Sequence, residues 1–323
     1  MTRSTGVRLI GAVWLLASLS AAVAVAQDYP RRPISIVVPG TSGGSPDVMA
    51  RLFAQRLSEA MGQQVVVDTV PGASGIIGVQ KVVRAPADGY TVLYGFNQLV
   101  TMNPHLIPNL PYNPERDLAP VSILADLGYV WIANNDLPAN TVAEWITLAR
   151  AQPGKLSFGT TGPGSAANLG GELFMEQTGT RILAVAYKGN SNPDLIAGII
   201  NLKMEPYTTA IPLIESKRVK ALAITGAARL AVMPNVPTMA EALPGYVITG
   251  WHAVWLPANT PQAIVDRLNA EFVKVAKLPE MVERMRTVGL QPVAGTAQEL
   301  RDLTREETAK WGRLIKSRNI KVE

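Results

Sequence analysis

The amino-acid sequence predicts an α/β protein of about two domains, and three observations lead to that prediction. The chain has 323 residues, of which 47% are apolar and 17% are charged. A domain typically holds about 100 to 200 residues, so this length favours two. The apolar content is sufficient for substantial cores, and the charge is too low for a disordered chain. The third observation is an alternation of short apolar runs with amphipathic segments.

The first third of the chain shows this alternation. Residues 34–38 (ISIVV) form a β-branched, apolar run, as expected for a buried parallel strand. Residues 47–61 carry apolar side chains at helical spacing. The same analysis predicts strands at 64–67 and 91–94 and a helix at 76–83. This βαβαβ order is typical of a doubly wound α/β domain.

Strands and helices continue to alternate after residue 120. Thr141, with Glu144 three residues later, has the signature of a capping box. Pro261 suits a helix start, because its missing N–H would be unpaired there. The pattern predicts strands at 121–125, 129–133, 156–159, 182–187 and 219–225, and helices at 141–151, 168–177, 261–277 and 297–316.

The first 26 residues are typical of an export signal. Arg3 and Arg8 precede an uncharged apolar stretch, 9–26, which ends in the A-x-A cleavage pattern Ala24-Val25-Ala26. A retained membrane anchor is the alternative, although 18 residues are slightly short of the roughly 20 that span a bilayer. We therefore expect cleavage near Ala26 and a periplasmic protein.

Composition excludes several classes of function. Cysteine is absent, so disulfides, thiolate metal sites and a cysteine nucleophile are excluded. The histidines are His105 and His252, which argues against a histidine-rich metal site. Without the signal the formal net charge falls from +5 to +3, too little to indicate nucleic-acid binding. We expect no metal ion and no cofactor.

A first small-residue loop, 39–47, follows a predicted strand and opens a predicted helix. Within it, residues 40–44 match G-x-S-x-G, the nucleophile elbow of α/β-hydrolases. A serine hydrolase using Ser42 and His252 is therefore one hypothesis. The elbow would stand on the first strand of the mature chain, however, and no HGGG-type oxyanion loop precedes it. Free N–H groups and glycines at a helix start favour an anion or ligand site instead.

A second such loop, 160–168, contains G-x-G-x-x-A at 162–167, the dinucleotide fingerprint. The acidic residue expected at the end of the next strand is missing, and Pro163 removes one backbone donor. Two loops rich in glycine and hydroxyl groups suggest two opposed jaws. A third loop, 71–75, includes Ser74, which could contact a ligand or cap the following helix.

The motifs, taken together, resemble the substrate-binding receptors of tripartite tricarboxylate transporters, known as Bug-type receptors. The resemblance covers nearly the whole mature chain. The matching stretches, in the family's order, include 29–34 (YPRRPI), 38–39 (VP), 43–44 (GG), 71–73 (PGA), 88–91 (DGYT), 103–104 (NP), 117–122 (DLAPVS), 153–156 (PGKL), 171–174 (GELF), 187–189 (YKG), 236–238 (VPT) and 257–258 (PA).

This resemblance implies a two-lobed, type II-like periplasmic-binding-protein fold. Each α/β lobe would hold a mixed sheet flanked by helices, and crossing strands would join the lobes. Residues 27–125 and 246–323 would form lobe 1, and residues 126–245 would form lobe 2. The resemblance places loops 39–47 and 160–168 opposite one another across a ligand cleft. The expected ligand-binding residues are Ser42, Gly43, Gly44, Asp47, Ser74, Thr161, Gly162, Ser165, Ala166, Asn168, Asn201 and Glu205.

Several positions depart from the family pattern. Gly40 and Thr41 stand where the family usually has an aromatic residue and a proline. Asn168 replaces a frequent histidine, and the usual Gly-Gln-Val-Asp stretch is 198–201 (GIIN) here. These changes leave the fold prediction intact but bear on the identity of the ligand.

The sequence therefore predicts a non-enzymatic, monomeric receptor for a small organic anion. By the resemblance, a carboxylate would be captured and delivered to a two-subunit membrane permease. The serine hydrolase remains an alternative, and so does a receptor that reports its ligand to a signalling partner.

Overall fold

The first apolar run becomes the inner strand of a parallel sheet. In the computed structural model, which describes residues 29–40, 42–187, 189–287 and 289–321, strand β1 (Ile34–Val38) lies between β2 (Val65–Thr69) and β3 (Thr91–Phe96). Four of its five residues are buried and Ser35 is partly buried, as expected for a strand covered on both faces. The expected export signal lies outside the described residues.

Antiparallel strands complete this first sheet. β3 pairs with β9 (Thr249–Pro257), β9 pairs with β4 (Leu118–Ala133), and β10 (Leu290–Pro292) pairs with β4. The second sheet has the same plan. β5 (Ser157–Thr160) lies between the parallel strands β6 (Leu183–Ala186) and β7 (Leu202–Pro206). β7 and β8 (Lys220–Ile224) both pair antiparallel with β4.

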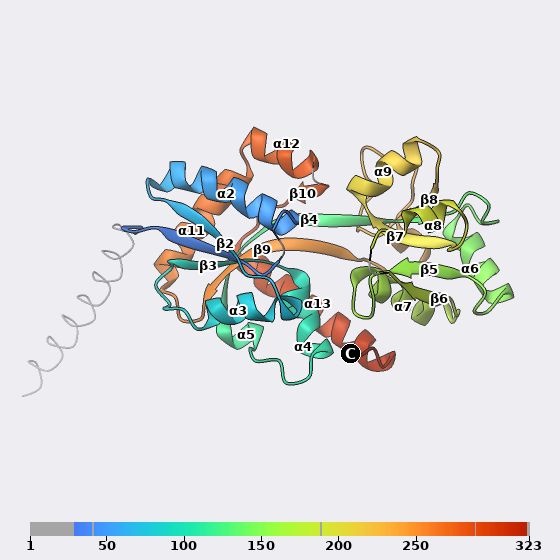
Figure 1. Cartoon of the computed structure of the whole chain (residues 1–323), viewed down its shortest axis with the longest axis horizontal. Helices are drawn as coiled ribbons and strands as arrows, with labels where there is room; N and C mark the ends of the chain where they lie inside the picture. The colour runs from blue at the N-terminus through green and yellow to red at the C-terminus, as the bar shows by residue number, and fades with distance from the viewer. Residues whose placement is uncertain (1–28, 41, 188, 288, 322–323) are drawn as a thin grey trace, which may run out of the picture.

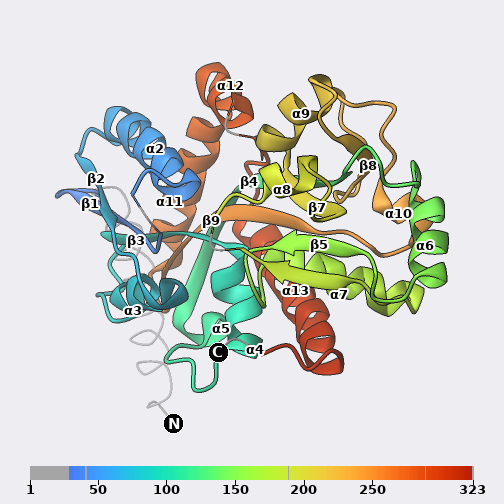
Figure 2. The same cartoon turned by 45° about the vertical axis from the view of Figure 1, so that its right-hand side comes forward.

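Helices cover both sheets, as Figures 1 and 2 show. Their apolar stripes form separate cores on the faces of each sheet. The helices and helical turns are α2 (Ser45–Met61), η1 (Ala73–Gly75), α3 (Ile76–Val83), η2 (Gln98–Met102), α4 (Asn103–Leu106), α5 (Pro114–Asp117), α6 (Val142–Ala151), α7 (Ala166–Thr178), α8 (Asn192–Ile196), α9 (Tyr207–Glu215), α10 (Met239–Ala242), α11 (Gln262–Ala276), α12 (Pro279–Thr287) and α13 (Ala297–Ser317).

Two long strands, β4 and β9, run between the lobes (Figure 1). β4 pairs with β9 as far as Gly128, with β7 from Tyr129 onward and with β8 from Val130 onward. A side chain at Gly128 would place its Cβ 1.8 Å from a ring carbon of Tyr207. Because Gly128 has no side chain, the ring of Tyr207, from α9 of the second lobe, can lie directly against β4 at this crossing point.

Most predicted elements occur close to their expected bounds. The helices at 76–83 and 142–151 agree within one residue, and Thr141 accepts a hydrogen bond from the Glu144 N–H. Glu144 returns its bond to the Asn140 N–H rather than completing the box at Thr141. The two strands expected at 121–125 and 129–133 are one continuous strand, β4. Asp126 and Gly128 interrupt the apolar pattern, but pairing with β9 continues through them.

The C-terminal helix α13 contacts both lobes. Its first half packs on the first lobe through Leu300. Its second half packs on the second lobe through Trp311 and Leu314. Arg318, just beyond the helix, is ion-paired with Glu172 of α7 at 2.7 Å. The division predicted from the sequence assigns 246–323 to lobe 1, and within that segment α13 packs against the cores of both lobes.

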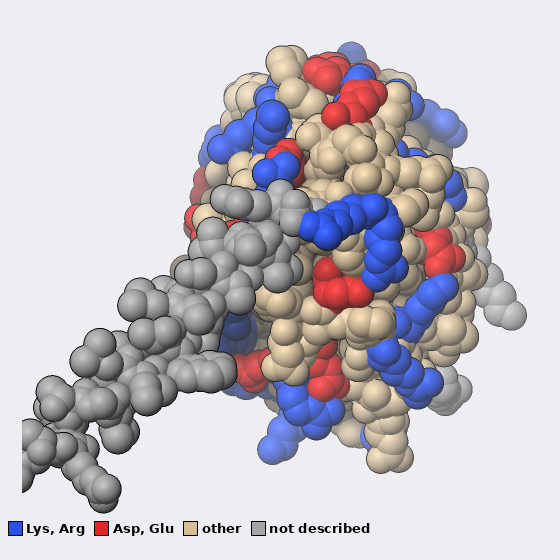
Figure 3. All heavy atoms as spheres, turned by 90° about the vertical axis from the view of Figure 1, so that its left-hand side faces the viewer, with Lys and Arg blue, Asp and Glu red and all other residues tan. Residues whose placement is uncertain are grey.

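Acidic and basic side chains are mixed on the end of the first lobe. Figure 3 shows both signs interspersed over that face, with no broad area of a single charge. Interspersed charges of both signs are common on protein surfaces.

Candidate functional site

A cleft of about 630 Å³ lies where the two sheets meet. The start of α2 and residues 96–98 contribute one wall, and the ends of β5 and β7 contribute the opposite wall. Residues of β4 and β9 lie between them. The carboxyl ends of parallel strands in both lobes thus face one hollow, which is where ligands bind in open α/β sheets.

The two jaw loops have the same backbone design. In the first, the Gly43 N–H donates to Asp47 Oδ2 at 2.9 Å; in the second, the Gly164 N–H donates to Asn168 Oδ1 at 3.0 Å. Gly43 and Gly164 each have φ near 77°, a conformation that favours glycine. Each acceptor lies in the first turn of its helix and holds the preceding loop against it.

Asp47 is buried, with its side chain 3% exposed, and it organises the first loop. Arg51 pairs with it at 3.0 Å, and Thr69 donates to it at 2.7 Å. Burial alone would raise the pKa of the Asp47 carboxyl. The hydrogen bonds from Arg51, the Gly43 N–H and Thr69 outweigh burial and lower that pKa to about 2.

Neutral groups organise the second loop. Ser165 is the N-cap of α7 and accepts from the Asn168 N–H at 3.3 Å. Its hydroxyl also lies 2.7 Å from the Thr160 hydroxyl and donates to the Gly162 carbonyl at 2.8 Å. The Ser165 hydroxyl is thus fully engaged by the loop itself.

Ser45, in the first loop, differs from Ser165 in its hydrogen bonding. The N-cap of α2 is Gly44, which has no side chain to bond the free N–H groups of the first turn. The Ser45 hydroxyl, one residue further on, is buried, lines the cleft and has no hydrogen-bond partner among the described residues. The ligand-binding residues expected from the sequence include Ser42 but not Ser45. The signal that could have found it is its place at the first helical position, two residues before the anchoring Asp47.

The structure brings together four of the expected ligand-binding residues. Thr161, Ser165, Ala166 and Glu205 line the cleft. The other eight expected residues, Ser42, Gly43, Gly44, Asp47, Ser74, Gly162, Asn168 and Asn201, are not among the residues that line it.

Three of these eight residues have other positions in the structure. The side-chain Oδ1 of Asn201 accepts from the Ser157 N–H at 2.8 Å and so ties the start of β5 to the start of β7. Ser74 is exposed, and its main-chain carbonyl accepts from Asn103 at 3.1 Å. Ser42 is exposed on the first jaw loop.

An ion pair in the second lobe was not expected. Lys203 Nζ lies 2.7 Å from Glu205 Oε2, and both residues line the cleft. They are two residues apart on β7, so their side chains lie on the same face of that strand. Sequence reasoning had singled out Glu205 but not Lys203, because their pairing depends on the unpredicted strand β7.

Comparison with known proteins identifies the family. The family described as "Tripartite tricarboxylate transporter family receptor" matches residues 49–320. The chain belongs to this family. The resemblance found in the sequence is thereby confirmed, and the two-lobed α/β fold agrees with the solved relatives.

Relatives extend over nearly the whole receptor. Protein BugT of Bordetella pertussis is 34% identical over 327 residues, covering 100% of this chain and 99% of that protein. An R. palustris protein solved with adipate has 36% identity and a TM-score of 0.75, covering 91% of this chain and 100% of its own. MatC from Rhodopseudomonas palustris, solved with bound malate, has 26% identity and a TM-score of 0.72 and covers 89% of this chain and 100% of its own.

His252 lines the cleft, but its burial and its contact with Tyr94 are those of a packing residue. The residue is 3% exposed, and burial lowers the pKa of its imidazole to about 4, so the ring is neutral at pH 7. Its Nδ1 lies 3.2 Å from the Tyr94 hydroxyl. No hydrogen bond joins it to Ser42 in the part of the chain that the structure describes, and the hydrolase hypothesis requires such a bond.

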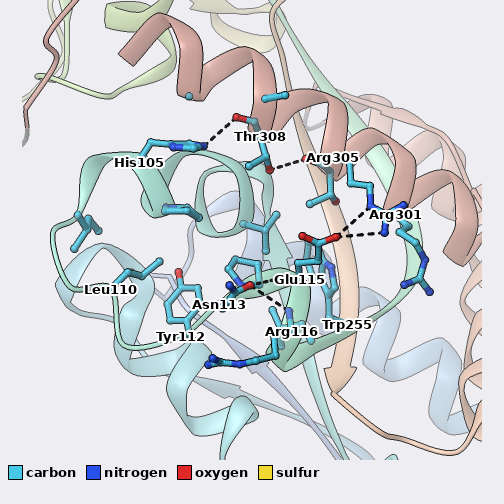
Figure 4. Close-up of a pocket in the computed structure, with 18 of the residues that line it drawn as sticks. His105, Leu110, Tyr112, Asn113, Glu115, Arg116, Trp255, Arg301, Arg305 and Thr308 are labelled. Atoms are coloured by element: carbon cyan, nitrogen blue, oxygen red, sulfur yellow. Dashed lines mark hydrogen bonds and ion pairs between the residues drawn. The ribbon is translucent and has the colours of Figure 1, made fainter. Parts of the chain in front are cut away.

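A larger hollow, of about 1030 Å³, lies outside the cleft between α13 and residues 104–116 (Figure 4). Its rim carries Arg301 and Arg305, and Arg305 lies 3.3 Å from Glu115 across the opening. These side chains are exposed, and water screens exposed charges. The interlobe cleft is the better candidate, because its polar groups are partly desolvated and both lobes contribute to it.

Within the described residues, no cluster of three or more His, Asp or Glu side chains could hold a metal ion. The described helices also include none that is long and apolar enough to cross a membrane.

Proposed function

We propose that this receptor is exported to the periplasm, captures a small organic acid between its lobes and delivers it to a membrane permease. The observation that carries the proposal is the meeting of two strand-to-helix loops in one cleft, where the Ser45 hydroxyl is buried and has no hydrogen-bond partner among the described residues. Its solved relatives with adipate and malate support an organic acid as the ligand.

Hydroxyl and N–H donors would hold the carboxylate at the jaw loops. The described parts of loops 39–47 and 160–168 contain no Lys or Arg, so recognition there depends on hydrogen-bond geometry. Rotation about β4 and β9, near Gly128, would close the lobes over the ligand. The closed shape would then be the form that the permease recognises. In this proposal the receptor acts as a monomer and without catalysis.

A thermal-shift screen of residues 27–323 tests ligand capture. The panel holds dicarboxylates, tricarboxylates, aromatic acids, amino acids and neutral compounds. Ligand at 100 times its Kd adds about 2.7 kcal/mol to the free energy of unfolding, which raises Tm by several degrees. A shift with one class of acid is expected. Folded, ligand-free protein that responds to no acid would contradict the proposal.

Three further measurements address the other parts of the proposal. A fluorophosphonate probe should leave Ser42 unlabelled, because a receptor has no activated serine. Mass spectrometry of periplasmic protein should find Gln27 at the mature N-terminus. Uptake of the acid by vesicles containing the permease should depend on added receptor; ligand binding without such uptake would favour a role in signalling.

A further inference from the structure

The ion pair between Lys203 and Glu205 lies in the cleft wall rather than on the outer surface. Their side chains are only 13% and 9% exposed. Charges taken out of water are costly unless they are paired and hydrogen-bonded. An ion pair kept at such a position will therefore strongly influence which ligand charges the cleft accepts.

Neighbouring side chains complete the pair. Lys203 Nζ donates to Asn192 Oδ1 at 2.7 Å, and Thr209 donates to Glu205 Oε1 at 2.6 Å. Asn192 Nδ2 also donates to that oxygen, at 3.4 Å. Asn192 and Thr209 line the cleft as well. We call these four side chains the 203–205 cluster.

The cluster adds no net charge to the cleft. Of the described residues that line it, Lys203 and Glu205 are the two that carry full charges, and the charges cancel. His252 is neutral at pH 7 because burial lowers its pKa to about 4. Burial raises the pKa of Tyr129 to about 12, so this hydroxyl is neutral too.

Large apolar side chains occupy much of the remaining wall. Phe96, Met102, Leu127 and Trp251 line the cleft from the first lobe and the crossing strands. Such a lining favours a ligand with an apolar body, while a few polar groups set its orientation.

We propose that the receptor selects a monocarboxylate with an apolar or aromatic body and an uncharged hydroxyl at the far end, directed at the 203–205 cluster. The proposal rests on the function proposed above and adds the ligand class. A hydroxyl can donate to Glu205 and accept from Lys203 at the same time. A second carboxylate would approach the Glu205 carboxylate, or would displace it from Lys203 and leave it buried and unpaired. Dicarboxylates of the same length are therefore disfavoured.

Calorimetric titration of residues 27–323 with two matched pairs of acids tests this selectivity. The first pair is 4-hydroxybenzoate and benzene-1,4-dicarboxylate; the second is 6-hydroxyhexanoate and adipate. In at least one pair we expect the hydroxy acid to bind ten-fold or more tightly than its dicarboxylate. Equal or tighter binding of the dicarboxylates overturns the proposal.

The screen described above separates the two possible failures. If none of the four acids binds but another acid stabilises the protein, the selectivity proposal is overturned and the receptor function stands. If no acid stabilises the folded, ligand-free protein, both proposals fail.

Substitutions in the 203–205 cluster test whether the cluster determines the selectivity. Glu205→Gln leaves Lys203 without its counter-charge, so the preference should move toward the dicarboxylate by ten-fold or more. The double variant Lys203→Met, Glu205→Gln removes both charges and should bring the two acids close to equal affinity. It also avoids an unpaired buried charge, so it serves if the single variant fails to fold.

Glu241→Gln is the matched control. Glu241 is ion-paired with Arg229 at 2.6 Å on an exposed part of the second lobe, outside the cleft. This variant should keep the wild-type ratio of affinities. A double variant that also keeps that ratio would overturn the role of the cluster.

Discussion

The two jaw loops show how one backbone geometry can be held by different chemistry. In both, a side chain in the first helical turn accepts from a glycine N–H four residues earlier, at 2.9 Å in one and 3.0 Å in the other. The first loop uses the Asp47 carboxylate, which is also fixed by Arg51 and Thr69. The second uses the neutral Asn168 amide. The first loop should therefore respond to pH and the second should not.

The serine hydroxyl groups of the two loops also differ, in their hydrogen bonding. Ser165 caps its helix and is fully engaged, whereas Ser45 lies one position inside its helix and, in the part of the chain that the structure describes, has no hydrogen-bond partner. This offset suggests a division of roles. The second loop uses its serine to hold its own shape, and the first keeps a serine free for a ligand.

The largest effect is expected from a bulky residue on the second loop. Ser165→Trp would place an indole in the cleft, so ligand affinity should fall more than 100-fold, which corresponds to over 2.7 kcal/mol. Ser42→Trp should change affinity less than three-fold, because Ser42 is exposed and is not among the residues that line the cleft. Calorimetric titration with the acid found in the screen gives both values. Equal losses would show that Ser42 also faces the ligand.

Removal of each loop anchor compares their contributions to stability. Asp47→Ala leaves the Gly43 N–H and Thr69 without their acceptor and should lower the free energy of unfolding by about 2–3 kcal/mol. Asn168→Ala removes a neutral acceptor and should cost about 1–2 kcal/mol. Urea denaturation measures both. A larger loss for Asn168→Ala would reverse the comparison.

The pH dependence should distinguish the charged anchor from the neutral one. The folded pKa of Asp47 is about 2, below the roughly 3.9 of an unfolded aspartate. Its contribution is therefore complete above about pH 4 and is lost as pH falls through 2. The stability difference between wild type and Asp47→Asn should shrink by about 1–2 kcal/mol over that range. The difference for Asn168→Ala should stay constant.

The smallest effect concerns the two serines themselves. Ser45→Ala should weaken ligand binding about five-fold, the value of one modest hydrogen bond, and leave stability nearly unchanged. Ser165→Ala removes a helix cap and should lower stability by about 1 kcal/mol. Thermal unfolding with and without ligand measures the two effects. Loss of stability in Ser45→Ala would mean that its hydroxyl has a structural partner.

Local pattern predicted much of the fold. The run 34–38, with four apolar residues in five, is long enough for a strand and too short for a helix, and the small residues after it favour a loop. Pattern failed where tertiary pairing overrides it. Asp126 and Gly128 look like a strand break, yet β9 continues alongside them. Strand β7 was not predicted, so the face shared by Lys203 and Glu205 could not be seen.

The candidate site was predictable as two loops and only partly as side chains. Glycine and hydroxyl residues between a strand and a helix identify 39–47 and 160–168 without a structure. Whether Ser42 or Ser45 faces the cleft depends on the turn at Gly43, where φ is 77°.

The sequence by itself therefore determined much of the order of strands and helices and the family resemblance, and it predicts the export signal. These follow from short-range periodicity and from motifs that stay in order along the chain. The tertiary structure decided which hydroxyl is free, where β4 passes from one sheet to the other and which charges meet in the cleft. These features depend on side chains brought together from distant segments, such as Ser45 and Lys203. No local pattern encodes their distance or burial.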